Sequence, residues 1–222
     1  MTGKAVILAS EEMAEIILRI AKCESGSWEF ASADSLEALE KIFENEEIEL
    51  LFSFGTSVIV PASILSKPNL TAVNLHAASP QYPGRDPHHF AVYEGASKYG
   101  ATFHFMTASV DAGPIIDVEL FHVPNDARPI DLWDQANEAA YRLLGKYLPS
   151  LLAGNILSPN PNLEWAGKKR SRKDFLDLCR IDLDISEEEF TRRHRACQMP
   201  GYSNLYTTIQ GRRFYMTIDP TE

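Results

Sequence analysis

The chain has 222 residues, of which 45% are hydrophobic and 23% charged, a balance typical of one globular domain with at most a small appendage. It carries 21 basic against 31 acidic side chains, a formal net charge of −10, so binding to nucleic acid is not expected. The sequence has no apolar run of the roughly 20 residues that a membrane span needs, and its three cysteines form no closely spaced pair. These features predict a cytoplasmic protein with free thiols and no membrane partner.

The first half of the chain alternates between short apolar runs and amphipathic helical patterns. Four runs predict strands, at residues 4–9, 28–31, 50–54 and 71–76. A helix follows the first run from Ser10, and a second helix begins at Asp34, which with Glu37 resembles a capping box. Alternating strands and helices are typical of parallel βαβ units. The sequence therefore predicts an α/β fold with a doubly wound, Rossmann-like sheet.

After the fourth predicted strand a proline-rich loop spans residues 77–87. The elements expected beyond it are a helix at 88–94, strands at 101–106 and 114–123, a long helix at 130–152, a helix at 186–196, and strands at 205–209 and 213–218. The last two strands flank a Gln-Gly turn, so they predict a short hairpin near the end of the sequence.

The composition of the chain changes near Ser158, where a linker of Pro and Asn residues begins. The segment 167–213 carries eleven Lys or Arg against seven Asp or Glu, a local net charge of +4. This change predicts a Rossmann-like catalytic domain over residues 1–157. A linker and a small, truncated β-rich C-terminal subdomain are expected over 158–222.

Polar side chains at the end of the fourth predicted strand are the first candidates for chemistry. Asn74 and His76 lie two residues apart, so in a strand they point to the same side. Open α/β sheets bind ligands at the carboxyl ends of their strands. An amide N–H beside an imidazole suits a reaction that develops an oxyanion and moves a proton. Asp111, in the loop after the next strand, is the candidate carboxylate to hold the imidazole, although the same spacing fits a plain loop start with polar caps.

Three longer motifs carry a resemblance to a known family. They are NLHAASPQYPG from Asn74, GATFHFM from Gly100 and VDAGPII from Val110. Their order resembles the 10-formyltetrahydrofolate-dependent formyltransferase family: Asn-x-His, a proline-rich loop ending in Gly, a Gly-x-Thr-x-His strand, and Asp-x-Gly before an Ile pair. The first loop is one residue shorter than the common family form, and in this it is similar to small sugar N-formyltransferases. GKKRS and RRHRACQMPGY in the tail look like the family's entry into its C-terminal β-subdomain.

The resemblance implies an active site of Asn74, His76 and Asp111. In this family an amine attacks the formyl carbon of the co-substrate 10-formyltetrahydrofolate, with no metal and no covalent enzyme intermediate. The Asn74 amide and a protonated His76 would stabilise the tetrahedral oxyanion, while Asp111 would hold His76 and help to remove the proton. The resemblance also places the folate against two loops, with candidate contacts at Phe54, Ser57, Val58, Ile59, Val60, Val110, Gly113 and Ile115.

The acceptor that the resemblance implies is the amine of a nucleotide-linked amino sugar used in surface polysaccharide biosynthesis. The first strand runs into Glu11 and Glu12 rather than a glycine-rich phosphate turn, so glycinamide ribonucleotide is not expected. Candidate residues for binding the nucleotide sugar are Asp86, His88, Arg193, Arg195 and Tyr202. Plain alternatives stay open, because His88 also fits an exposed helix start and the arginines also fit a solvated basic helix face.

The same motifs are also compatible with other reactions and other acceptors. A 10-formyltetrahydrofolate hydrolase would use water in place of the amine, although such relatives usually carry an extra N-terminal domain. Methionyl-tRNA is a further acceptor, reached only through the basic tail, and a non-catalytic folate-binding protein is a third alternative. His104 is expected to pack or to make a structural hydrogen bond, and Trp133 to lie in the core or in a homodimer contact.

Overall fold

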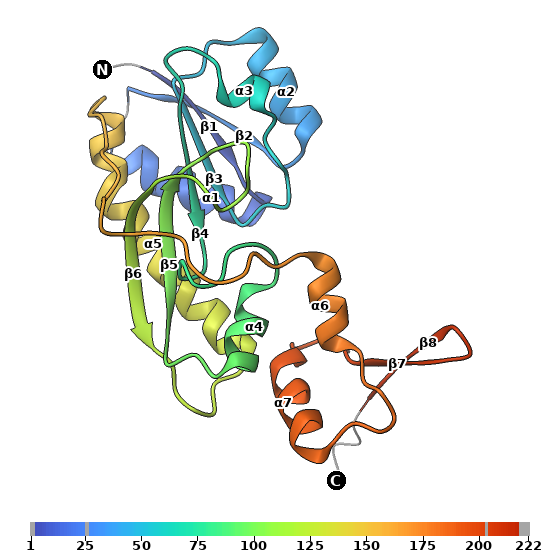
Figure 1. The fold of residues 1–222 in the computed structure, drawn as a ribbon. Coiled ribbons are helices and arrows are strands. Elements are labelled where there is room, and N and C mark those ends of the chain that lie inside the picture. Colours follow the sequence, from blue (N-terminus) through green and yellow to red (C-terminus); the bar gives the residue numbers. More distant parts are fainter. Residues whose placement is uncertain (1–2, 25–26, 203, 218–222) are drawn as a thin grey trace.

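The computed structural model of the chain describes residues 3–24, 27–202 and 204–217. Its centre is a six-stranded sheet in the order β2-β1-β3-β4-β5-β6 (Figure 1). The first four strands run parallel, whereas β5 is antiparallel to β4 and β6 is antiparallel to β5. The strands are β1 (Lys4–Leu8), β2 (Glu29–Ala33), β3 (Leu50–Phe54), β4 (Thr71–His76), β5 (Lys98–Phe105) and β6 (Ile115–His122). The predicted α/β sheet is confirmed.

Helices cover both faces of this sheet. The helices α1 (Glu11–Glu24) and α5 (Pro129–Leu152) pack on one face, and α2 (Leu36–Asn45) and α3 (Ala62–Leu65) pack on the other. Side chains of successive strand residues point to opposite faces. The buried residues facing α1 and α5 include Ile7, Phe52 and Leu75, and those facing α2 and α3 include Val6, Leu8 and Leu51. This double cover explains why the strands are continuous apolar runs.

The C-terminal part adds two helices and a hairpin beside α4 (Pro87–Glu94). They are α6 (Arg172–Cys179), α7 (Glu187–Cys197), and the antiparallel strands β7 (Tyr206–Ile209) and β8 (Arg212–Tyr215). One buried cluster joins them to the first part of the chain through Phe90, Leu132, Phe175 and Cys197. The boundary between residues 157 and 158 stays a prediction, because the two parts share this core.

Three helices differ from the sequence-based expectation, of which the short helix α3 was predicted by no pattern. The second helix begins one residue later than expected, because the hydroxyl of Ser35, not Asp34, accepts a hydrogen bond from the Ala38 N–H at 3.3 Å. The helix α6 was not expected at all. It begins with a capping box, in which Ser171 accepts from the backbone of Asp174 and the Asp174 carboxylate accepts from the backbone of Ser171. This motif was present in the sequence as a short-range signal.

The last strand of the tail departs from expectation, whereas the three cysteines are free, as expected. The last strand ends at Tyr215, and Ile218 of the expected 213–218 strand lies outside the described residues. Cys179 and Cys197 are both buried, and their Sγ atoms lie 3.5 Å apart although the sequence separates them widely. Within the described ranges, no helix has the length and apolarity needed to cross a bilayer.

Candidate active site

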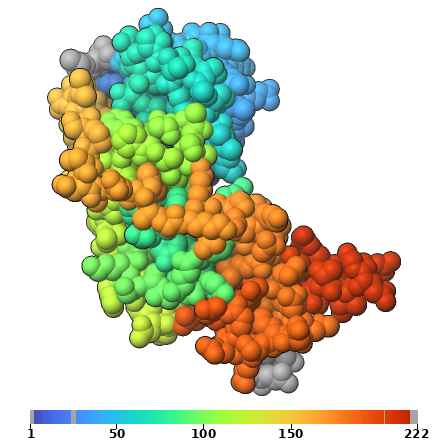
Figure 2. All heavy atoms as spheres, in the orientation of Figure 1, coloured from blue at the N-terminus to red at the C-terminus, as the bar shows by residue number. Residues whose placement is uncertain are grey.

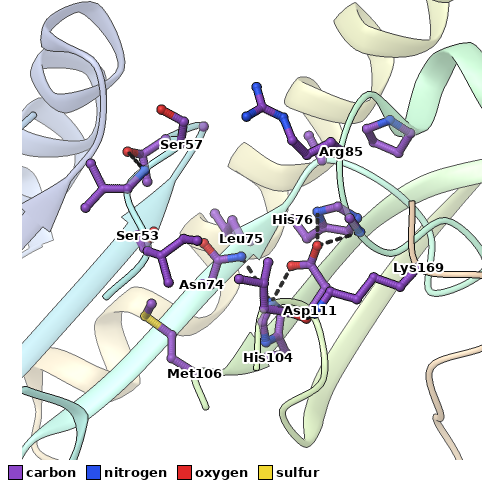
Figure 3. Close-up of a pocket in the computed structure, with 18 of the residues that line it drawn as sticks. Ser53, Ser57, Asn74, Leu75, His76, Arg85, His104, Met106, Asp111 and Lys169 are labelled. Atoms are coloured by element: carbon purple, nitrogen blue, oxygen red, sulfur yellow. Dashed lines mark hydrogen bonds and ion pairs between the residues drawn. The ribbon is translucent and has the colours of Figure 1, made fainter. Parts of the chain in front are cut away.

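A cavity of about 430 Å³ opens at the carboxyl ends of β3 and β4 (Figure 3). Its walls come from the loop after β3, the ends of β4 and β5, the loop 107–114, the start of α4 and residues 169–170 of the tail. The sheet brings these distant segments together. Because ligands bind at this edge of open α/β sheets, the cavity is the candidate active site.

The strand β4 carries two polar side chains to the cavity. Val73 and Leu75 are buried in the core on one face of the sheet, and Asn74 and His76 point to the other side and line the cavity. Leu75 also contributes to the cavity lining. The alternation follows from the two-residue period of a strand. The structure therefore brings together the two residues that the spacing singled out.

The Asp111 carboxylate lies between two imidazoles in Figure 3 and approaches His76 most closely. The distance from Asp111 Oδ2 to His76 Nδ1 is 3.6 Å, and the same oxygen accepts a hydrogen bond from the Gly84 N–H at 2.8 Å. His76 Nε2 lies 2.9 Å from the Tyr82 carbonyl oxygen, which can only accept, so Nε2 holds a proton. Nδ1 is left to face the carboxylate. A second proton on Nδ1 converts this contact into an ion pair.

The backbone around Asp111 is held in an unusual conformation. Asp111 has a φ of 46°, in the left-handed region that non-glycine residues rarely adopt. Two residues later, a Cβ atom at Gly113 would overlap the carbonyl oxygen of Phe105 in β5. Only glycine permits this approach, which sets the Asp loop against the strand end. The Asp-x-Gly spacing thus has a direct steric cause.

His104 fixes the orientation of the Asn74 amide. Asn74 Nδ2 lies 3.0 Å from His104 Nε2, and His104 Nδ1 lies 2.8 Å from the carbonyl oxygen of Phe105. Burial lowers the pKa of His104 to about 4, so the ring is neutral, with its proton on Nδ1. Nε2 then accepts one N–H of Asn74, and the amide keeps its second N–H for a ligand. The structural hydrogen bond expected of His104 is present, and its 3.8 Å contact with Asp111 is no ion pair while the ring is neutral.

The residues expected to contact the folate divide into two groups. Ser57, Val58, Ile59, Val60 and Val110 line the cavity, and Ile59 and Val110 are 64% and 41% exposed. Phe54, Gly113 and Ile115 are not among the lining residues. Phe54 and Ile115 are buried in the core, where Phe54 packs edge-on against Tyr141. Gly113 belongs to the loop 107–114 but does not line the cavity.

The residues expected to contact the nucleotide sugar also divide. Asp86 and His88 line the cavity at the start of α4. Burial, with a smaller contribution from His89, lowers the pKa of His88 to about 3, so this imidazole is neutral. Asp86 has a φ of 54°, and its Oδ2 atom is buried with no hydrogen-bond partner within the described part of the chain.

The other three expected contacts do not reach the cavity. Arg193 pairs with Glu189 at 2.6 Å and donates to the carbonyl oxygen of Arg180 at 2.8 Å. Arg195 donates to the Asn125 carbonyl oxygen, and Tyr202 is 72% exposed outside the lining. The Glu-to-Arg spacing of four residues on one helix was a usable signal for the first pair. Arg193 thus bonds within the tail, and Arg195 joins α7 to the loop before α5.

Sequence reasoning missed several side chains of the cavity. Trp133, expected in the core or in a dimer contact, is 38% exposed and lines the cavity with Arg85. Lys169, from the linker, lines it as well and donates to the Val110 carbonyl oxygen, 59 residues away in the sequence. No local pattern marks such contacts. Within the described ranges, no group of three or more His, Cys, Asp or Glu side chains is arranged to hold a metal ion.

The fold and the site define a class of α/β protein with solved members. The structure is similar to a 4-N formyltransferase from Francisella tularensis, with a TM-score of 0.78 and 21% identity over 98% of this chain and 97% of that one. It is also similar to an N-formyltransferase from Helicobacter canadensis in complex with folinic acid and dTDP-3-aminofucose, with a TM-score of 0.69 and 18% identity over 95% of this chain and 85% of that one. At these identities the similarity establishes the fold.

Sequence comparison gives the family. The model of the formyl transferase family matches residues 4–148, and the chain belongs to this family. A methionyl-tRNA formyltransferase from Halalkalibacterium halodurans is 33% identical over 128 residues, which cover 54% of this chain. The match spans only 40% of the length of that relative.

Proposed function

We propose that this protein transfers a formyl group from 10-formyltetrahydrofolate to the amine of a nucleotide-linked amino sugar. The observation that carries the proposal is the convergence of the Asn74 amide, the His76 imidazole and the Asp111 carboxylate on one cavity. Family membership supports the formyl chemistry, and the ligands named for the Helicobacter canadensis protein support the acceptor class.

The cavity suits the folate co-substrate on its apolar side. The exposed side chains of Ile59 and Val110 offer surface for a flat heterocycle, and Ser57 supplies a polar group nearby. Ligand pockets commonly combine apolar walls with a few polar groups that set orientation. The loop after β3 and the Asp111 loop are therefore the proposed folate contacts.

The reaction needs three tasks from this chain. The acceptor nitrogen forms a bond to the formyl carbon, and the free N–H of Asn74 donates to the oxyanion that develops. Nδ1 of His76, the nitrogen that faces Asp111 and carries no proton, takes the proton that leaves the amine, and the Asp111 carboxylate stabilises the resulting imidazolium. The proton is passed to N10 of the folate as the bond between the formyl carbon and N10 breaks. Atoms and charge balance across the transfer, with tetrahydrofolate and a formamide as products.

The acceptor enters beside the start of α4. Neutral His88 can exchange hydrogen bonds with a sugar or amine without adding charge. Oδ2 of Asp86 lies 3.7 Å from the Arg172 guanidinium and has no hydrogen-bond partner among the described residues, so it can accept from a hydroxyl or amine. Trp133 supplies an exposed aromatic surface at the same cavity, and Arg85 supplies a cation. This set replaces Arg193, Arg195 and Tyr202 as the proposed substrate contacts.

Methionyl-tRNA is the second candidate acceptor, because curated relatives that are 33% and 31% identical to this chain carry that name. The formal charge of −10 disfavours a nucleic-acid substrate. Hydrolysis of 10-formyltetrahydrofolate remains the alternative reaction at the same site.

A homodimer, a cytoplasmic setting and a role in polysaccharide biosynthesis complete the proposal. The hairpin of β7 and β8 projects from the body of the molecule (Figure 2). It exposes Ile209, Phe214 and Tyr215, which are large apolar side chains. A second copy of the chain is the proposed cover for this surface.

The test is release of tetrahydrofolate from 10-formyltetrahydrofolate, measured with and without a panel of UDP- and dTDP-linked amino sugars. Release that depends on one sugar, with that sugar gaining the mass of a formyl group, is the expected result. Release without any amine identifies a hydrolase instead. Release only with methionyl-tRNA ends the sugar proposal and names the second acceptor.

A further inference from the structure

The linker between α5 and α6 crosses the surface and passes beside the active site. We call residues 160–170 the strap, and Figures 1 and 2 show it within the orange band that leads toward α6. Its first residue, Asn160, donates a backbone hydrogen bond to the Ile115 carbonyl oxygen at 2.8 Å. Further on, Ala166 N donates to the Pro80 carbonyl oxygen at 2.9 Å. The strap thus contacts the start of β6, directly after the loop 107–114, and the proline-rich loop.

The far end of the strap is bound to the proline-rich loop through backbone contacts. Arg170 donates to Pro83, and Arg85 donates back to Arg170, both at 2.9 Å. A Cβ atom at Gly84 would overlap the carbonyl oxygen of Arg170, and Gly84 has a φ of 97°. The two segments approach so closely that only glycine fits. This contact resists displacement of the strap from the cavity.

One strap side chain touches the catalytic set directly. The Trp165 ring lies 4.9 Å from the His104 ring at 85°, and 5.8 Å from the His76 ring, measured between centroids. Its indole N–H donates to the Gly113 carbonyl oxygen at 2.7 Å, two residues after Asp111. One residue therefore packs against both imidazoles and tethers the loop that carries the carboxylate.

We propose that Trp165 is a positioning residue of this active site and that the strap is a required part of the site. Trp165 acts through His76, His104 and the loop 107–114, and it has no direct role on the reacting atoms. Edge-on aromatic contacts restrict the ring orientations that an imidazole can adopt. The strap lies outside the family match at residues 4–148. The catalytic part of this inference rests on the proposed function.

The experiment compares three variants with the unaltered chain. Trp165→Ala removes the ring and the tether, and Trp165→Phe keeps a ring but removes the N–H. Trp28→Phe is the matched control, because Trp28 also donates its indole N–H to a backbone carbonyl, that of Leu152, at 2.8 Å and outside the cavity. Each protein is measured for kcat and KM, and for hydrogen exchange of the amides in 107–114 by mass spectrometry.

In Trp165→Ala, kcat is expected to fall about tenfold or more with both KM values within about threefold, because misplaced catalytic groups slow the chemical step. Amides of the loop 107–114 are expected to exchange faster in both Trp165 variants, and their exchange is expected to be unchanged in Trp28→Phe.

A rise in KM with unchanged kcat makes Trp165 a ligand contact and overturns the positioning role. Unchanged exchange of the loop in both variants overturns the tether. Exchange needs no turnover, so it decides the proposal even when no acceptor supports formyl transfer, and Trp165→Phe serves if the alanine variant does not fold.

Discussion

Burial of a neutral His104 makes the stability of this protein sensitive to mild acid. The pKa of His104 is lowered to about 4 from the ordinary value of 6.5 because the ring is buried. In the unfolded chain the ring takes up a proton near pH 6.5, so between these two values the unfolded state binds more protons than the folded state. The free energy of unfolding therefore falls as the pH falls through this window.

The size of this effect follows from the shift. One pKa unit corresponds to about 1.4 kcal/mol, so His104 alone costs about 2 kcal/mol of stability between pH 7 and pH 5. His104→Gln removes the titration and keeps an acceptor for the Asn74 N–H. Urea unfolding followed by tryptophan fluorescence across this pH range measures the free energy for both proteins. Groups shared by the two proteins, such as His88, contribute alike and cancel in the difference.

The expected result is a steeper loss in the unaltered protein than in His104→Gln, with a difference of about 2 kcal/mol at pH 5 relative to pH 7. Parallel curves would refute the reasoning, because they mean that His104 takes up its proton in the folded state as it does in the unfolded one. Asn74 would then face a second donor instead of an acceptor.

The remaining predictions concern the roles of single side chains. His76→Ala is expected to abolish formyl transfer with an unchanged melting temperature, whereas the matched exposed variant His122→Ala keeps its turnover; near-native turnover in His76→Ala removes the residue from the mechanism. Asn74→Ala is expected to lower kcat by about 10²- to 10³-fold as the loss of an oxyanion donor, and a loss below threefold contradicts that role. Replacing Arg193 and Arg195 with Ala is expected to lower the melting temperature and leave KM for the acceptor within twofold, and a selective rise in that KM would return both arginines to the substrate site.

Local patterns predicted much of the fold and the centre of the site. The apolar runs located the parallel strands, because strands covered on both faces must be apolar throughout. The two-residue period of a strand predicted that Asn74 and His76 share a side. The position of Asp111 in the loop after the next strand made it the candidate carboxylate, and the family motif added support for that role.

Contacts between segments that are distant in the sequence could not be predicted from local patterns. Trp165 meets Gly113 across 52 residues of sequence, and this pairing depends on where the strap runs after α5. Trp133 sits on a helix with an apolar face, and its periodicity is the same whether that position faces the core or a cavity. The capping box at Ser171 and Asp174, in contrast, was a local signal that should have predicted α6.

In the proposed function, the residues for the chemistry and the residues for acceptor recognition lie on different walls of the candidate active site. Asn74, His76 and Asp111 are held by a strand, a buried imidazole and glycine contacts that tolerate little change. Asp86 and His88, by contrast, present their side chains from the first residues of one helix. A lineage that keeps Asn74, His76 and Asp111 can therefore change its acceptor through a few substitutions at the start of α4. The evolution of new acceptors and the preservation of the reaction are in this way placed under separate selection.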